Sequence, residues 1–209
     1  MKKYLVLIIC LLSITANAGQ RAVTDEGNIV ILNSNGTWQY ESPGIIKQLE
    51  IKTNNAIFKK GSKSTFRLKS KKNKSSFWIN PKKWSFKKAE DVNQAEYDFQ
   101  LPGTDLYGMA ITEKIEIDLD NLCKIALENA KGAAPDSKIV IQEYRIVNGN
   151  KVMYMEIEGT MQGIKFKYLG YYYSDSFGST QYITYTGSNL VDLYKQDIKK
   201  FLNGFSVQK

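Results

Sequence analysis

The stretch IKFKYLGYYY, residues 164–173, decides how this chain folds. Its first half alternates apolar and basic residues, which is typical of a strand with one buried face. Its second half is aromatic on both sides, so we expect that end of the strand to be covered on both faces. Helices packed on opposite sides of a sheet would provide this cover. The stretch therefore predicts a strand in the middle layer of a sandwich.

Extended segments and turns surround this central stretch. Candidate strands cover residues 97–101, 106–117, 138–147, 152–158 and 180–186. Asn148-Gly149-Asn150 marks a tight turn between two of them, because these residue types tolerate positive φ. We expect the strands and two helices to form an α+β domain with an antiparallel sheet of six or seven strands.

The two helices are indicated by apolar residues at helical spacing. Residues 118–131 begin with Asp118 as a capping residue and stop at Gly132, and residues 189–202 form the second helix. Cys123 lies in the middle of the apolar stripe of the first helix. We interpret it as a small core residue, and the alternative is a redox-active thiol.

Residues 1–18 have the layout of a cleavable secretory signal of bacterial type. A basic start precedes the apolar run Tyr4–Leu12, and small residues end at Ala18. The run is too short to span a membrane, and Cys10 lies inside it rather than at a lipid-attachment position. We expect cleavage near Ala18, a periplasmic or secreted protein, and no transmembrane segment after cleavage.

The remaining chain divides into three parts. Residues 19–42 predict a small β-hairpin module, with Asn35-Gly36 as a type I′ turn signal. Residues 43–64 are a connecting segment. Residues 65–209 form the α+β domain, which includes a lysine-rich hairpin at residues 65–80.

The composition excludes several classes of chemistry. The chain has no histidine, which removes Ser-His-Asp and Cys-His catalysis and His-ligated zinc. After signal cleavage Cys123 is the one remaining cysteine, which removes an internal disulfide. We find no glycine-rich phosphate loop and no carboxylate-rich calcium loop. We therefore predict a non-enzymatic protein with no catalytic residues, metal or cofactor. A histidine-free hydrolase or transferase that uses Ser, Asp, Glu or Lys is the alternative.

Positive charge is concentrated in one segment. The formal net charge is +8, and from Lys52 to Lys88 there are 13 basic residues and no acidic one. The candidate anion-binding residues are Lys69, Lys71, Lys72, Lys74, Lys82 and Lys83. They would contact an anionic lipid or glycan of the envelope, whereas export argues against a nucleic-acid partner. The alternative is a solvated turn that uses lysine for solubility and to protect a sheet edge.

Tyrosines form the densest aromatic group in the sequence. Tyr171, Tyr173, Tyr182 and Tyr185 are candidates for a face that binds a partner, because tyrosine combines an apolar ring with a polar hydroxyl. The alternative is that these rings fill the sheet.

Two charged residues stand in otherwise apolar segments. Glu113 lies in a β-rich stretch, and Arg145 lies between Tyr144 and Ile146. A partly buried carboxylate needs a partner, and a guanidinium can hold one through two hydrogen bonds. We hypothesise a structural ion pair between them. The alternative is two unrelated surface charges.

Glu156 and Glu158 share one face of a strand, as two acid/base residues would. A turn at Met161-Gln162 would set Glu158 opposite Lys165 and Glu156 opposite Lys167. Cross-strand ion pairs explain both carboxylates without catalysis.

Short segments in a fixed order give the chain a family likeness. They are Asn80–Trp84, Ile111–Glu113, Glu143–Gly149, Tyr168–Ser174 and Phe201–Phe205. Across roughly residues 76–207 the chain resembles exported bacterial members of the Mog1/PsbP-like fold, an α/β/α sandwich around an antiparallel sheet. The resemblance implies an accessory or binding protein: one class supports the oxygen-evolving complex of photosystem II, and another binds a small GTPase of nuclear transport. It implies no catalytic set.

Together these patterns predict an exported, non-enzymatic accessory or binding module of the bacterial envelope. Its partner would be an envelope protein or an anionic envelope component. The alternative function is an electrostatic adaptor that binds anionic lipid or glycan through the Lys69–Lys83 region.

Overall fold

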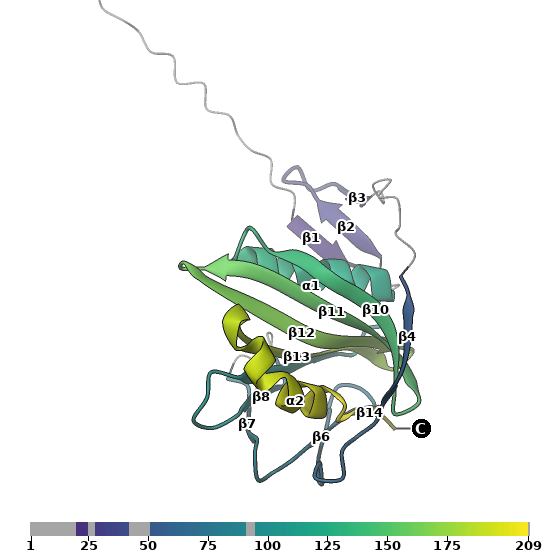
Figure 1. The fold of residues 1–209 in the computed structure, drawn as a ribbon. Helices are drawn as coiled ribbons and strands as arrows, with labels where there is room; N and C mark the ends of the chain where they lie inside the picture. Colours follow the sequence, from purple (N-terminus) through teal and green to yellow (C-terminus); the bar gives the residue numbers. More distant parts are fainter. Residues whose placement is uncertain (1–19, 25–27, 42–50, 91–94, 209) are drawn as a thin grey trace, which may run out of the picture.

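The central stretch of the sequence forms β12 (Ile164–Asp175), in the interior of an eight-stranded sheet (Figure 1). The computed structural model describes residues 20–24, 28–41, 51–90 and 95–208, so the signal predicted over residues 1–18 lies outside the described residues. The strand order of this main sheet is β4-β10-β11-β12-β13-β9-β8-β7. The bounds are β4 Thr53–Phe58, β7 Ser85–Lys88, β8 Tyr97–Gln100, β9 Tyr107–Glu113, β10 Lys138–Val147, β11 Asn150–Met161 and β13 Gly178–Gly187.

The prediction of six or seven antiparallel strands was wrong in two respects. The main sheet has eight strands, and β4 runs parallel to β10 at one edge. β4 comes from the segment predicted to be a connection, and its sequence TNNAIF shows no alternation of polar and apolar residues. Its place in the sheet is set by pairing with β10, which its own sequence does not reveal.

Helices cover opposite faces of the main sheet, as the central stretch predicted (Figure 1). On one face, α1 (Leu119–Ala133) packs Leu122 and Cys123 in a cluster with Met153 and Met155 of β11. The Asp118 side chain accepts hydrogen bonds from two backbone N–H groups of the first turn, at 3.0 and 3.2 Å, which confirms the predicted cap. The main sheet is therefore the middle layer.

The other face is covered by α2 (Val191–Leu202) and by a small second sheet. That sheet has the order β14-β6-β5, with bounds β5 Phe66–Lys69, β6 Ser75–Ile79 and β14 Phe205–Val207. The lysine-rich hairpin predicted at residues 65–80 is β5 and β6. It therefore lies over the main sheet as part of a separate sheet.

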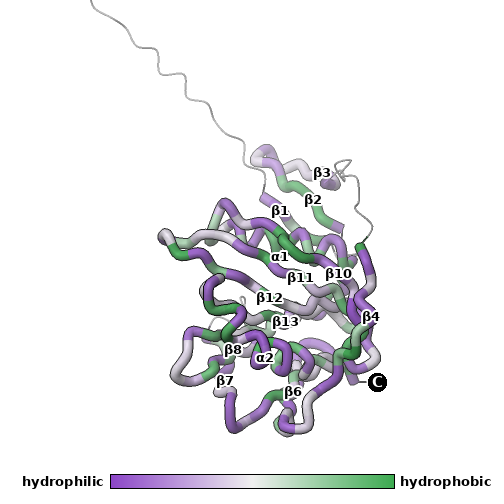
Figure 2. Tube along the Cα trace, in the orientation of Figure 1, coloured by the Kyte–Doolittle hydropathy of each residue, from purple (hydrophilic) through white to green (hydrophobic). Residues whose placement is uncertain are grey.

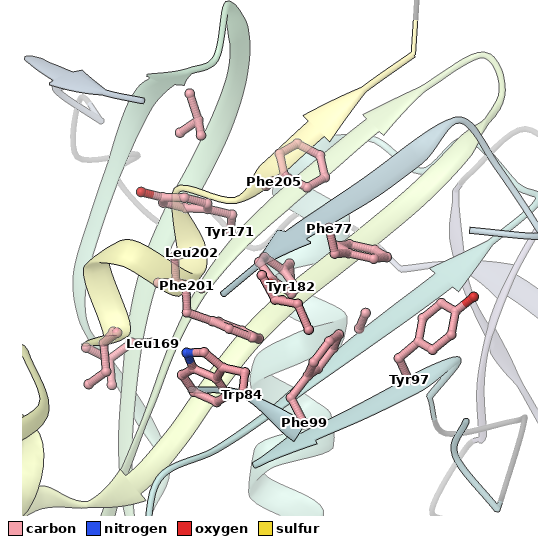
Figure 3. Close-up of a cluster of buried hydrophobic side chains, with 14 of the residues drawn as sticks. Phe77, Trp84, Tyr97, Phe99, Leu169, Tyr171, Tyr182, Phe201, Leu202 and Phe205 are labelled. Carbon is pink, nitrogen blue, oxygen red and sulfur yellow. The ribbon is translucent and has the colours of Figure 1, made fainter. Parts of the chain in front are cut away.

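Aromatic rings fill the space between the main sheet and this second cover (Figure 3). Phe201 of α2 stacks on Tyr182 of β13, with ring centroids 4.5 Å apart, and Phe77 of β6 lies 4.8 Å from Tyr182. Trp84 contacts Phe201 at 4.1 Å. All four side chains are buried, so this cluster joins α2, β6 and the main sheet.

A small meander of β1 (Gln20–Val23), β2 (Ile29–Leu32) and β3 (Trp38–Tyr40) lies over α1 (Figure 1). Its middle strand is hydrophobic (Figure 2). Arg21 joins the meander to α1 through an ion pair with Glu128, with nitrogen and oxygen 3.0 Å apart. At the predicted Asn35-Gly36 turn only Gly36 has a positive φ, 81°, so the hairpin is present but its turn is not type I′.

Candidate functional site: a basic layer on one face of the main sheet

The positively charged segment crosses the main sheet from one edge strand to the other. It follows β4 at one edge, forms β5 and β6 above the sheet, and ends in β7 at the opposite edge. We call residues 59–88 the basic layer, because every charged side chain in this range is Lys or Arg. The basic segment of the sequence therefore places positive charge on one side of the molecule, the side of the main sheet that α2 covers.

Glu96 fixes the turn between β5 and β6. Its carboxylate accepts hydrogen bonds from the Ser70 hydroxyl at 2.8 Å, the Lys71 backbone N–H at 2.7 Å and the Thr112 hydroxyl at 2.5 Å. Asn73 adds a second attachment by donating from Nδ2 to the backbone oxygen of Ser179 at 2.8 Å. The turn is held against the main sheet, so its lysines project from a fixed base.

The six lysines predicted to bind anions do not form one patch. Lys69, Lys71, Lys72 and Lys74 lie near the start of β6, whereas Lys82 and Lys83 follow its end. β6 has five residues and spans roughly 16 Å at a strand's rise per residue. The Lys69–Lys83 region therefore presents two separate groups of lysines, and anion binding by them stays a prediction.

Neighbours already engage several of these lysines. Lys72 Nζ lies 3.4 Å from a carboxylate oxygen of Glu113, and Lys74 Nζ lies 3.4 Å from the centroid of the Phe177 ring. Lys69 and Lys71 are exposed. Lys71 lies close enough to Lys88 to lower the pKa of Lys88, by hydrogen bonding and like-charge repulsion. Among the residues that the structure describes, no carboxylate lies within 4.0 Å of the amino group of Lys69 or Lys71, so this exposed part of the first group carries positive charge.

The partner face predicted from Tyr171, Tyr173, Tyr182 and Tyr185 is wrong. Tyr171 and Tyr182 are 1% and 0% exposed and belong to the aromatic core. Tyr173 and Tyr185 are half-buried; the first donates to Asp175 at 2.9 Å, and the second stacks on Tyr107 at 5.5 Å. Tyr182 and Tyr185 are three positions apart on one strand and so point to opposite faces. The rings fill the sheet, which was the alternative interpretation.

The ion pair predicted between Glu113 and Arg145 is also wrong. β13, β12 and β11 lie between β9, which carries Glu113, and β10, which carries Arg145. Four strand spacings separate the residues by roughly 19 Å. Glu113 pairs with Lys72 instead, and Arg145 pairs with Glu143 at 2.6 Å.

Aromatic rings surround the Arg145 guanidinium. Its central carbon lies 3.4 Å from the centroid of Tyr154 and 4.6 Å from that of Phe58. Burial lowers the pKa of Arg145, but hydrogen bonding and charge at Tyr171 and Glu143 outweigh burial, and the pKa is raised overall. Arg145 is thus a permanently charged residue that packs the edge of the core.

Glu156 and Glu158 form ion pairs, but the predicted register was wrong. Lys167 Nζ lies 3.3 Å from Glu156 and 4.0 Å from Glu158, whereas Lys165 is opposite Thr160. The turn is at Gln162-Gly163, where φ is 51° and 80°, rather than at Met161-Gln162. The two carboxylates share one lysine, which favours a structural role.

Burial makes the Cys123 thiol unreactive. The residue is 2% exposed in the α1 core. Desolvation by burial, followed by the charges of Asp120 and Asp118, raises the pKa of Cys123 to about 12. We expect the folded protein to react with a thiol reagent at pH 8 about a thousandfold more slowly through Cys123 than an exposed cysteine does, because only the thiolate attacks.

The measurement is the rate of reaction with a chromogenic disulfide reagent, with and without denaturant. A Cys123→Ala variant identifies the contribution of this residue. Rapid labelling of the folded wild type that is lost in Cys123→Ala would contradict the structural interpretation.

A pocket that the sequence did not indicate lies between α2 and two turns of the basic layer. Its volume is about 240 Å³, and Lys63, Lys83, Trp84, Lys200 and Phe201 are among the residues that line it. Its wall comes from segments around residues 61–64, 80–84 and 197–201. No local motif could have revealed it, because only the fold brings these three segments together.

Comparison with known proteins adds a name for the fold. A scan against protein-family models finds no match, and neither does a search of curated proteins. Among solved structures, cyanobacterial PsbP (CyanoP) from Synechocystis sp. PCC 6803 is similar, with a TM-score of 0.55 and 14% identity. The match covers 71% of this chain and 95% of that chain. This chain has a PsbP-like fold.

The family likeness seen in the sequence is thus confirmed at the level of fold. A Pseudomonas aeruginosa protein of unknown function is also similar, with 9% identity and a TM-score of 0.44, over 69% of this chain and 97% of its own. In this PsbP-like fold, α1 lies on one face of the sheet, and β5 and β6 of the basic layer lie on the other. Within the described ranges, no helix has the length and apolar character needed to cross a membrane, and no cluster of three metal-binding side chains occurs.

Proposed function

We propose that this protein is an exported, non-catalytic binding module of the bacterial envelope that docks on an anionic phospholipid surface through its basic layer. The observation that carries the proposal is the basic layer itself. Residues 59–88 contain no acidic side chain; their strands β5 and β6 cover one face of the main sheet, and β7 forms its edge. Such a surface attracts anions over a distance of several ångströms and is screened by salt.

An exposed aromatic pair favours lipid over a glycan as the anionic surface. Phe66 of β5 and Phe86 of β7 are each 41% exposed, and their ring centroids lie 5.3 Å apart. Arg67, Lys87 and Lys88 flank the pair in sequence. Rings beside basic residues can enter the boundary between head groups and acyl chains, while the cations remain with the phosphates.

The competing proposal, a protein partner bound through tyrosines, has lost its main support because two of those four tyrosines are buried in the core. A discrete protein partner therefore becomes an outcome of the test below.

The test is sedimentation of the protein with vesicles that contain or lack phosphatidylglycerol, at low and high salt. We expect binding only to the anionic vesicles, and weaker binding at high salt. A Lys69→Gln/Lys71→Gln/Lys88→Gln variant should bind about a hundredfold more weakly, since each lysine near an anionic surface contributes about 1 kcal/mol.

The matched control changes Lys114, Lys124 and Lys165 to glutamine. These lysines are exposed and lie outside the basic layer. The control removes the same charge and should bind like the wild type. If both variants bind the vesicles equally weakly, the effect comes from the net charge of the protein and not from the basic layer. Unchanged binding of the first variant would disprove the proposal.

A further inference from the structure

The pocket between α2 and the basic layer has an unusual balance of charge. Lys63, Lys83 and Lys200 line it together with one carboxylate, that of Asp197. Lys83 Nζ lies 2.6 Å from the Asp197 carboxylate, so this pair is neutral. Among the residues that the structure describes, no carboxylate lies within 4.0 Å of the amino group of Lys63 or Lys200. Two positive charges therefore remain for a ligand.

One wall of the pocket is apolar. Trp84 and Phe201 both line it, and their rings meet with centroids 4.1 Å apart and an interplanar angle of 32° (Figure 3). Both side chains are anchored in the core, with exposures of 5% and 1%, so the wall is rigid. A ligand that contacts both walls needs an anionic group and an apolar group side by side.

The size of the pocket limits the ligand further. Its volume of about 240 Å³ is below the roughly 300–1,000 Å³ typical of sites for drug-sized molecules. Ser62 and Ser64 on one turn, and Asn80 on the other, add polar groups to the lining. These dimensions fit one head group rather than a whole amphiphile.

We propose that this pocket binds a phosphate ester, with the phosphate between Lys63 and Lys200 and the ester's apolar part on Trp84 and Phe201. The inference rests on the proposed docking at phospholipid and gives it a defined site for one head group. Lysine binds phosphate as a compact cation, and the aromatic wall selects an ester over the free ion.

Trp84 provides a direct probe of the pocket. A Trp38→Phe/Trp78→Phe variant leaves Trp84 as the fluorescent reporter. The protein is purified after the expressing cell has exported it and removed any signal peptide. We expect a saturable change in Trp84 fluorescence when dihexanoyl phosphatidylglycerol is added below its micelle concentration. Lys63→Gln/Lys200→Gln on this background should raise the dissociation constant by about tenfold or more, because two charge-assisted contacts are lost.

The matched control is Lys69→Gln/Lys71→Gln on the same background. These lysines lie at the other end of β6, so binding in the pocket should be unchanged even though vesicle binding falls. The two proposals can therefore fail separately. The protein could fail to bind vesicles and still bind dihexanoyl phosphatidylglycerol in the fluorescence titration. Equally, it could fail in the titration and still bind vesicles.

Inorganic phosphate, titrated alone, distinguishes the sources of the ligand. Binding at least tenfold weaker than that of the lipid assigns the pocket to a head group, whereas equal binding assigns it to free phosphate. Equal lipid affinity in the wild type and Lys63→Gln/Lys200→Gln would overturn the proposal, as would the absence of any saturable signal with either ligand.

Discussion

Replacing Phe201 with alanine is expected to lower the free energy of unfolding by about 3–5 kcal/mol, the usual cost of deleting a buried aromatic ring. Phe201 is 1% exposed and lies 4.1 Å from Trp84, 4.5 Å from Tyr182 and 5.0 Å from Phe99, measured between ring centroids. Alanine would leave a cavity at the point where α2, the basic layer and the main sheet meet. Rigid neighbours on all sides limit how far the cavity can collapse.

Urea unfolding of the wild type and the variant measures the difference. Leu193→Ala on the same helix is the matched control, because Leu193 is 71% exposed and its truncation should change stability by less than about 0.5 kcal/mol. Similar losses in the two variants would mean that α2 does not anchor this face of the sheet.

Gly204→Ala should destabilise the protein by about 3 kcal/mol or more, despite adding only one methyl group. A Cβ at this position would be forced onto the backbone carbonyl oxygen of Trp78, and it would also lie 2.9 Å from the carbonyl oxygen of Phe201. The Trp78 N–H donates to the Gly204 carbonyl oxygen at 2.9 Å, so the two backbones cannot separate without losing this hydrogen bond. Backbone atoms cannot turn aside as a flexible side chain can.

Gly132→Ala is the informative control for this substitution. Gly132 lies inside α1, and nothing is within 4 Å of the Cβ that alanine would add. Alanine should therefore stabilise the helix by about 0.5–1 kcal/mol. Thermal and urea unfolding should give opposite signs for the two variants, and destabilisation of equal size would contradict the contact between Gly204 and β6.

The position of β12 in the middle layer could be predicted because a short stretch of sequence is enough to show that a strand is buried on both faces. Residues 164–173 carry aromatic side chains on both faces, and any structure that buries them must cover both sides. The two helices could likewise be predicted from the spacing of their apolar residues, and the first also from its cap Asp118, whereas α2 has no side-chain cap. β4 and β14 could not be predicted, because each is short and its position depends on pairing with a strand far away in the sequence. β4 pairs with β10, and β14 pairs with β6.

The positive charge of the candidate site could be predicted from the sequence, but the arrangement of its side chains could not. The run of basic residues correctly indicated a positively charged surface, since a count of charges needs no fold. The partners of its lysines could not be predicted, because Glu113 and Asp197 follow the segment in the sequence and reach it only through tertiary packing. The pocket had no signal of its own for the same reason.

Two misassignments could have been avoided from the sequence. Tyr182 and Tyr185 are an odd number of positions apart, so they could not share one face of a regular strand. Gly163 makes Gln162-Gly163 a better two-residue turn than Met161-Gln162, because glycine accepts positive φ at the second position. The true turn moves the pairing by two residues and gives Lys167 to both glutamates.

The pairing of β6 with β14 determines when the basic layer can be completed. Phe77 lies opposite Phe205, so one edge of the apolar strand SSFWI stays open during folding until residues near 205 pair with it. An open apolar edge invites pairing with other copies of the chain. Lys74 immediately before this strand, and Lys82 and Lys83 soon after it, would repel such copies. These lysines would thus act as gatekeepers against aggregation while the chain is still folding.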